Sequence, residues 1–119
     1  MAELKSFKRG ESSEVHGALA DEFADWVDTG TIEGAKIVVN GYRLTNSQHN
    51  VDENGNPAKK AIIDVQYAEG EDKNNYGWST ESKTILRQLS EQEFPFLTAI
   101  ESVPLKRNPK WSTLTFTEV

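Results

Sequence analysis

The chain has 119 residues and no cysteine, which is the length of one domain and excludes disulfides and thiolate metal sites. Hydrophobic residues make up 36% of it, its mean hydropathy is -0.63, and no apolar run is long enough to predict a membrane span. The formal net charge is -6, but residues 1–35 carry three cations against eight carboxylates, whereas residues 36–119 carry ten against eleven. The acidic total therefore argues against a uniformly basic surface and leaves room for a local basic groove.

The first 18 residues are polar and rich in serine and glycine. We expect residues 1–18 to be a flexible polar arm, followed by one domain at 19–119. In "ALADEFADWVDTG", the apolar residues recur at helical spacing, and Gly30 is a natural stop. This pattern predicts a short amphipathic helix at about 20–28, with Trp26 in the core.

Two long strands are expected next. The β-branched run "GAKIVVNGYRLTN" predicts a strand at about 34–45. Ile37 and Val39 share one of its faces, Tyr42 lies on the other, and Gly41 indicates a bend or bulge. "KKAIIDVQYAEG" predicts a strand at about 59–68, with Tyr67 on the face of its apolar residues.

The segment "YGWS" predicts a short strand that leads into a helix, "STESKTILRQLSEQ", for which Ser79, Thr80 or Ser82 can be the N-cap. Strands after Pro95 and at 111–119 complete the chain. The order contains no alternation of strand and helix, so a parallel sheet is not expected. We expect a mainly β protein: a five-stranded OB-fold barrel with a helix between strands 3 and 4 and a short N-terminal helix.

Residues that could carry catalysis are scarce. His16 and His49 are far apart in the chain, and no metal-ligand spacing, phosphate-binding loop or nucleophile elbow is present. We therefore expect no enzymatic activity, no catalytic residue, no metal and no cofactor.

Aromatic residues recur beside basic ones near the strand ends. Rings stack on unpaired bases, worth ~1–3 kcal/mol per base, and cations follow the phosphates, so this mixture indicates single-stranded nucleic acid. We expect Tyr76, Trp78 and Trp111 to stack on bases. The alternative is that Tyr76 and Trp78 cover a subunit interface. The expected phosphate contacts are Arg43, Lys59, Lys60, Lys83, Lys106, Arg107 and Lys110.

The succession "DEFADWVDTGTIEGAKIVVNGYRL", "KKAIIDVQYAEG", "GWSTESKTILRQL", "FPFLTAI" and "WSTLTF" resembles phage-encoded single-stranded DNA-binding proteins with an OB-fold, over about residues 20–118. In size the chain is similar to the member found in lactococcal phages. The resemblance implies sequence-independent binding and protection of single-stranded DNA during phage DNA replication or recombination, in the host cytoplasm and away from membranes.

The resemblance also implies a homo-oligomer that recruits a recombinase or replication proteins. The chain ends in "TFTEV" instead of a flexible acidic tail, which argues against recruitment through such a tail. RNA is an alternative to single-stranded DNA as the natural ligand. The alternative function is that of a phage structural or assembly protein that uses an OB-like barrel for protein–protein contacts.

Overall fold

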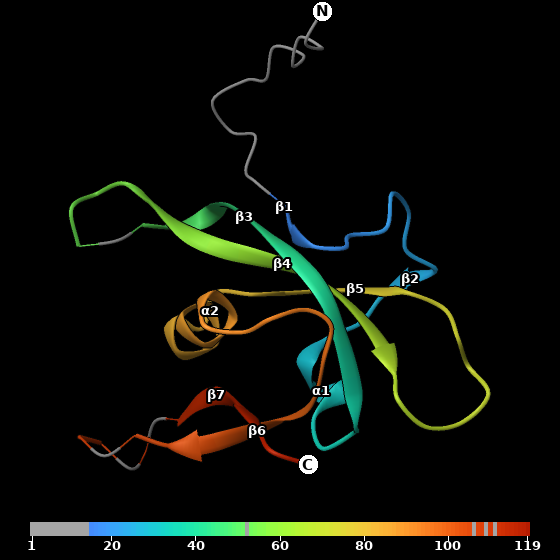
Figure 1. Cartoon of the computed structure of the whole chain (residues 1–119). Coiled ribbons are helices and arrows are strands. Elements are labelled where there is room, and N and C mark those ends of the chain that lie inside the picture. Colours follow the sequence, from blue (N-terminus) through green and yellow to red (C-terminus); the bar gives the residue numbers. More distant parts are fainter. Residues whose placement is uncertain (1–14, 52, 106, 109, 111) are drawn as a thin grey trace, which may run out of the picture.

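The computed structural model describes residues 15–51, 53–105, 107, 108, 110 and 112–119 (Figure 1). This part of the chain is mainly β, and neither of its helices is long and apolar enough to cross a membrane. In chain order the elements are β1 (Val15–Gly17), β2 (Asp25–Trp26), α1 (Thr29–Ile32), β3 (Ile37–Val51), β4 (Pro57–Tyr67), β5 (Tyr76–Thr80), α2 (Lys83–Ser90), β6 (Phe96–Pro104) and β7 (Ser112–Thr117).

The strands form one open, mixed sheet in the order β2-β5-β4-β3-β6-β7, with β1 beside β3. Of the strand pairs in the described part of the chain, β2 and β5 run parallel and the others antiparallel. β3 is the central strand: it pairs with β4 along its length, while its first residues pair with β6 and its middle residues pair with β1. The sheet is open, with β2 and β7 as its end strands, so the mainly β class is confirmed and the predicted five-stranded barrel is not itself shown.

A bulge in β3 decides which side chains reach the core. Val39 lies opposite Val65 and Gly41 opposite Asp64, so Asn40 is an extra residue in the strand. Because one extra residue reverses the alternation of side chains, Tyr42 joins Val39 on the buried face. The predicted bulge at Gly41 is confirmed, and the predicted placement of Tyr42 on the opposite face is wrong for this reason.

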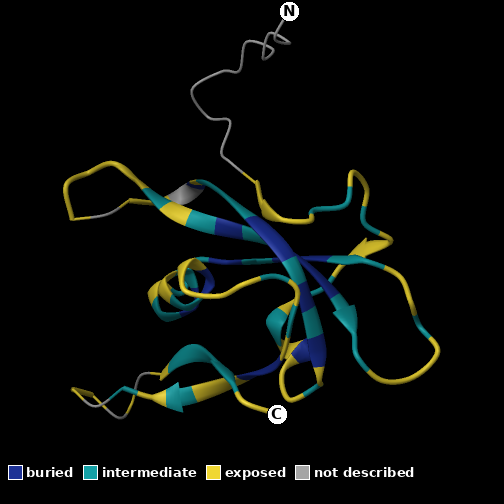
Figure 2. Ribbon diagram, in the orientation of Figure 1, coloured by how far each residue is buried: buried dark blue, intermediate teal, exposed yellow. Residues whose placement is uncertain are grey.

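The core lies between the concave side of the sheet and α2, and the buried residues follow the middle of the strands in Figure 2. Thr80 stays in β5, so α2 begins after Ser82, whose Oγ accepts from the backbone N–H of Ile85 at 3.3 Å. The buried members of the core are Ile32, Ile37, Val39, Tyr42, Ala61, Ile63, Val65, Trp78, Ile85, Leu89 and Ile100.

The predicted helix at 20–28 is wrong. Trp26 belongs to β2, which runs parallel to β5, and α1 is a single turn capped by Asp28. Backbone N–H groups of this segment find partners in the sheet: Ala24 donates to the carbonyl oxygen of Asn75 at 2.8 Å, and Val27 to that of Gly77 at 2.9 Å. Pairing with β5 therefore replaces the hydrogen bonds that a helix would have formed. Val15–Gly17, assigned to the arm, form β1.

Candidate nucleic-acid interface

Trp78 does not lie at the surface. Its side chain is fully buried, its Nε1 donates to Thr29 Oγ1 at 3.1 Å, and its ring meets the ring of Phe116 edge-on at 6.4 Å between centroids. The prediction that Trp78 stacks on bases is therefore wrong. Its strand carries it opposite Ile63 on the core face of the sheet, which its polar neighbours in the sequence did not reveal.

Tyr76 is half-buried on the same face of β5. Its ring packs edge-on against Tyr67 at 5.6 Å, and its hydroxyl donates to Asp72 Oδ2. That hydrogen bond raises the pKa of the Tyr76 phenol and lowers the pKa of the Asp72 carboxyl. Both the ring and the hydroxyl of Tyr76 are engaged within the protein, so this tyrosine is a weaker candidate for stacking than its sequence context indicated.

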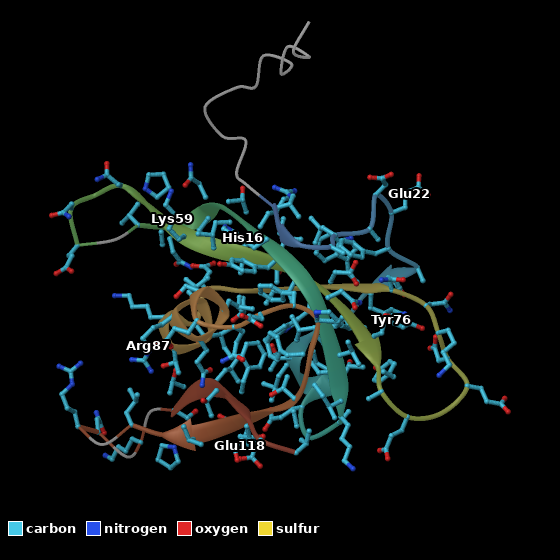
Figure 3. All side chains as sticks on the ribbon, in the orientation of Figure 1. His16, Glu22, Lys59, Tyr76, Arg87 and Glu118 are labelled. Atoms are coloured by element: carbon cyan, nitrogen blue, oxygen red, sulfur yellow. The ribbon has the colours of Figure 1, made fainter. Side chains whose placement is uncertain are left out.

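The basic residues fall into separate groups. Lys59 and Lys60 are adjacent in β4, so their side chains leave opposite faces. Lys59 lines a groove of about 520 Å³ between the β3–β4 hairpin and α2, together with Lys83 and Leu86. In Figure 3, Lys59 and Arg87 lie on the side of the molecule where this hairpin projects, far from Glu22 in the β1–β2 connection.

The groove between the β3–β4 hairpin and α2 is not uniformly basic. Glu53 and Glu81 line it beside the two lysines, and Glu81 accepts hydrogen bonds from Ser47 Oγ at 3.1 Å and Asn50 Nδ2 at 2.9 Å. Lys59 Nζ donates to Asn46 Oδ1 at 3.2 Å. The positive charge of this groove is thus largely balanced within the groove.

The connection between β6 and β7 supplies further predicted contacts. Arg107 and Lys110 are both exposed there, at the end of a hairpin that projects on the same side as the β3–β4 hairpin (Figure 1). Lys106 and Trp111 lie outside the described residues.

A second hollow, which we call the outer-face cleft, combines rings and a cation. It has a volume of about 530 Å³ and lies on the face of β3 and β4 that points away from the core. Arg43 and Ile62, which lie opposite each other in the β3–β4 ladder, line it. The outer-face cleft is also lined by Val15, Phe23, Trp26, Asp21 and Glu22.

Trp26 is the exposed ring of this cleft, with 55% of its surface accessible. Phe23 meets it edge-on at 5.3 Å between centroids. Both rings rest directly on Gly77: a Cβ at that position would lie 2.7 Å from Phe23 Cδ2 and 2.9 Å from Trp26 Cε3. Glycine in β5 therefore lets the two rings sit against the backbone of the sheet, while more than half of the Trp26 surface stays accessible to solvent.

The cations nearest this cleft come from neighbouring strands. Arg43 lines it directly, and Lys60 precedes Ile62 by two residues in β4, which places both on one face. Among the described residues, Arg43 forms no ion pair. One predicted contact, Arg43, thus shares a cleft with a ring that the sequence had assigned to the core, and a second, Lys60, lies on the same face of the sheet.

The sequence missed Trp26 and Phe23 as site residues because their helical spacing is equally the spacing of a buried stripe. The signal that identifies them is Gly77, a small residue in a strand interior where another segment approaches closely.

Comparison of the chain with protein-family models, with characterised proteins and with solved structures finds no significant match.

Proposed function

We propose that the protein binds single-stranded DNA along the outer face of β3 and β4. The observation that carries the proposal is the outer-face cleft, where the solvent-exposed ring of Trp26 lies in the same hollow as Arg43. An exposed ring that shares a cleft with a guanidinium is suited to a nucleotide, because the ring stacks on the base and the cation contacts the phosphate.

The strand order supports an OB-fold as the architecture behind this function. The five strands β3 to β7 lie in the order β5-β4-β3-β6-β7, and α2 follows β5 in the chain. An OB-fold is a partly open five-stranded barrel that binds oligonucleotides on its second and third strands, which correspond here to β4 and β5. We propose that β5 and β7 are the two margins of such a barrel, with α2 between them.

The biological setting that we propose follows the resemblance described above. The protein coats and protects single strands during phage DNA replication or recombination in the host cytoplasm, as a homo-oligomer that recruits a recombinase or replication proteins. Binding without strict sequence preference is expected, since stacking and phosphate contacts tolerate every base.

The test is a titration of the protein with fluorescein-labelled single-stranded DNA, followed by anisotropy, over a series of salt concentrations. Affinity should fall as salt rises, with a logarithmic slope of about -0.7 per phosphate contact. Trp26→Ala should weaken binding about tenfold, because base–aromatic stacking is worth ~1–3 kcal/mol. Arg43→Ala should weaken binding at low salt and reduce the salt slope by about 0.7, because it removes one phosphate contact. Lys73→Ala, which removes an exposed cation of the β4–β5 connection, is the matched control and should leave affinity unchanged. Absence of binding at low salt contradicts the proposal.

A role in assembly is the second candidate, and one observation favours it. Val15 and Trp26, which line the outer-face cleft, are 50% and 55% exposed, and exposed apolar side chains that cluster are typical of protein contacts. If this cleft is a subunit interface, Trp26→Ala will change the sedimentation coefficient of the protein. A variant that loses DNA binding while its sedimentation is unchanged would exclude this second function.

A further inference from the structure

We infer that the outer-face cleft distinguishes among bases: it favours a guanine over a thymine at one position of the bound strand. This inference rests on the proposed function, since it presumes that single-stranded DNA is the ligand. The cleft is large enough to hold one nucleotide, because its volume of about 530 Å³ lies within the range of roughly 300–1,000 Å³ typical of small-ligand pockets.

The cleft is electrostatically polarised. Arg43 reaches it from β3, whereas Asp21 and Glu22 line it from the β1–β2 connection. Among the described residues, neither carboxylate forms an ion pair. A phosphate is attracted to the side of Arg43 and repelled from the side of the two carboxylates. A nucleotide held between Arg43 and the two carboxylates therefore has its phosphate toward β3. Its base then lies toward Asp21 and Glu22, which we call the acidic wall.

The rings fix the plane of that base. Trp26 is 55% exposed, and Phe23, packed edge-on against it, limits its rotation. A base stacked on Trp26 directs its Watson–Crick edge, and not its π-face, at the surrounding polar groups. The edge that approaches the acidic wall meets carboxylate groups, which accept hydrogen bonds and have no donor.

Acceptors of this kind separate the four bases by the donors on their edges. Guanine presents two adjacent donors, N1–H and the N2 amino group, which match the two oxygens of one carboxylate. Cytosine and adenine each present one amino group. Thymine presents one N–H between two carbonyl oxygens, and those oxygens repel a carboxylate. The order of affinity should therefore run from guanine, the best, to thymine, the worst.

The experiment compares oligothymidylates that differ only in one central base: guanine, hypoxanthine or thymine. Hypoxanthine lacks the N2 amino group and so removes one of the two donors. We expect guanine to bind about fivefold more tightly than thymine, the lower end of the range for a bidentate base contact, with hypoxanthine in between. Affinity is measured by anisotropy of a label at the strand end, so base-specific quenching of tryptophan does not enter.

The deciding variant is Asp21→Asn with Glu22→Gln. Removing two negative charges should strengthen binding of all three strands, but the ratio of guanine to thymine affinity should fall toward one. The charge-matched control is Glu71→Gln with Glu91→Gln, both exposed and outside the lining of the cleft, and it should preserve the ratio.

Equal affinity for the guanine and thymine strands overturns the inference, as does a guanine preference that survives the Asp21→Asn, Glu22→Gln change. Either result leaves single-stranded DNA binding intact. If no strand binds, the proposed function itself fails. If instead an arginine-rich peptide binds in a manner that requires Asp21 and Glu22, the cleft is a peptide site and the inference is wrong.

Discussion

The side-chain amide of Gln88 pairs with the backbone of Phe116 as a neighbouring β-strand would. The Phe116 N–H donates to Gln88 Oε1 at 2.9 Å, and Gln88 Nε2 lies 3.4 Å from the Phe116 carbonyl oxygen. Gln88 Nε2 also donates to Thr115 Oγ1 at 2.9 Å. One residue of α2 thus covers part of the free edge of β7, an edge that would otherwise be open to pairing with another chain.

This contact leads to the first prediction. Gln88→Ala should lower the free energy of unfolding by about 1–3 kcal/mol, because it leaves half-buried backbone groups of β7 without partners. Hydrogen exchange of the Phe116 amide should accelerate more than that of amides in β4. The control is Gln92→Ala, an exposed glutamine just beyond the same helix, which should change neither quantity. Unchanged exchange at Phe116 would show that the pairing does not persist in solution.

The two tryptophans Trp26 and Trp78 should separate stability from binding. Trp78→Ala should cost about 3–5 kcal/mol of unfolding free energy, as expected for a buried aromatic residue. Trp26→Ala should alter stability by less than about 1 kcal/mol, since its ring is mostly exposed. Urea unfolding followed by far-UV circular dichroism measures both. A large loss of stability for Trp26→Ala would place that ring in the core after all.

The strands could be predicted from the sequence because their periodicity is local. Val65 lies between the polar residues Asp64 and Gln66, Val39 belongs to a β-branched run, and Gly41 shows where the alternation in that strand breaks. The helix α2 could be predicted for the same reason, since Ser82 and the apolar stripe that follows lie within a few turns. What holds β2 in place is not local: Trp26 pairs with Gly77, some fifty residues further on, and a helical spacing cannot reveal such a partner.

The candidate site was harder to predict than the fold. Lys59 and Lys60 look equivalent in sequence, yet the pleat of β4 sends them to opposite faces. Trp78 stands among polar residues and Trp26 in an apolar stripe, yet Trp78 is fully buried and Trp26 is 55% exposed. The difference arises because Trp78 points from β5 into the core, whereas Trp26 lies against Gly77 on the other face of β5. Arg43, a predicted phosphate contact, shares its cleft with Trp26, whereas Tyr76 and Trp78, the rings predicted to stack, lie on the core face of β5.

Asp64 provides a further prediction. Its carboxylate is 1% exposed, and it accepts from the Ala20 backbone N–H at 2.8 Å, Asn40 Nδ2 at 3.1 Å and Asn75 Nδ2 at 2.7 Å. It thus ties the segment before β2, the bulge of β3 and the start of β5 together. Asp64→Asn replaces one acceptor oxygen by a donor, so at least one of these N–H groups loses its partner.

We expect Asp64→Asn to lower the free energy of unfolding by about 1–3 kcal/mol and to accelerate hydrogen exchange at Ala20. DNA binding should weaken as well, because Ala20 belongs to the segment that carries Phe23 and Trp26. Glu69→Gln, an exposed carboxylate paired with Lys36 at 3.8 Å, is the control and should have little effect. If Asp64→Asn leaves exchange at Ala20 unchanged, the carboxylate does not hold this segment.

The last prediction concerns alkaline pH. Burial raises the pKa of the Tyr42 phenol above its ordinary value of 10.0, so the folded protein holds the neutral phenol more firmly than the unfolded chain does. The resulting stabilisation is complete below that ordinary value and is lost as the pH rises through the pKa of the folded state. Urea unfolding of the wild type should therefore show stability falling above pH 10.0. Tyr42→Phe should remove part of this loss, and Tyr76→Phe a further part, because the hydrogen bond to Asp72 also raises the pKa of Tyr76. Parallel alkaline curves for wild type and Tyr42→Phe would show that Tyr42 does not titrate with unfolding.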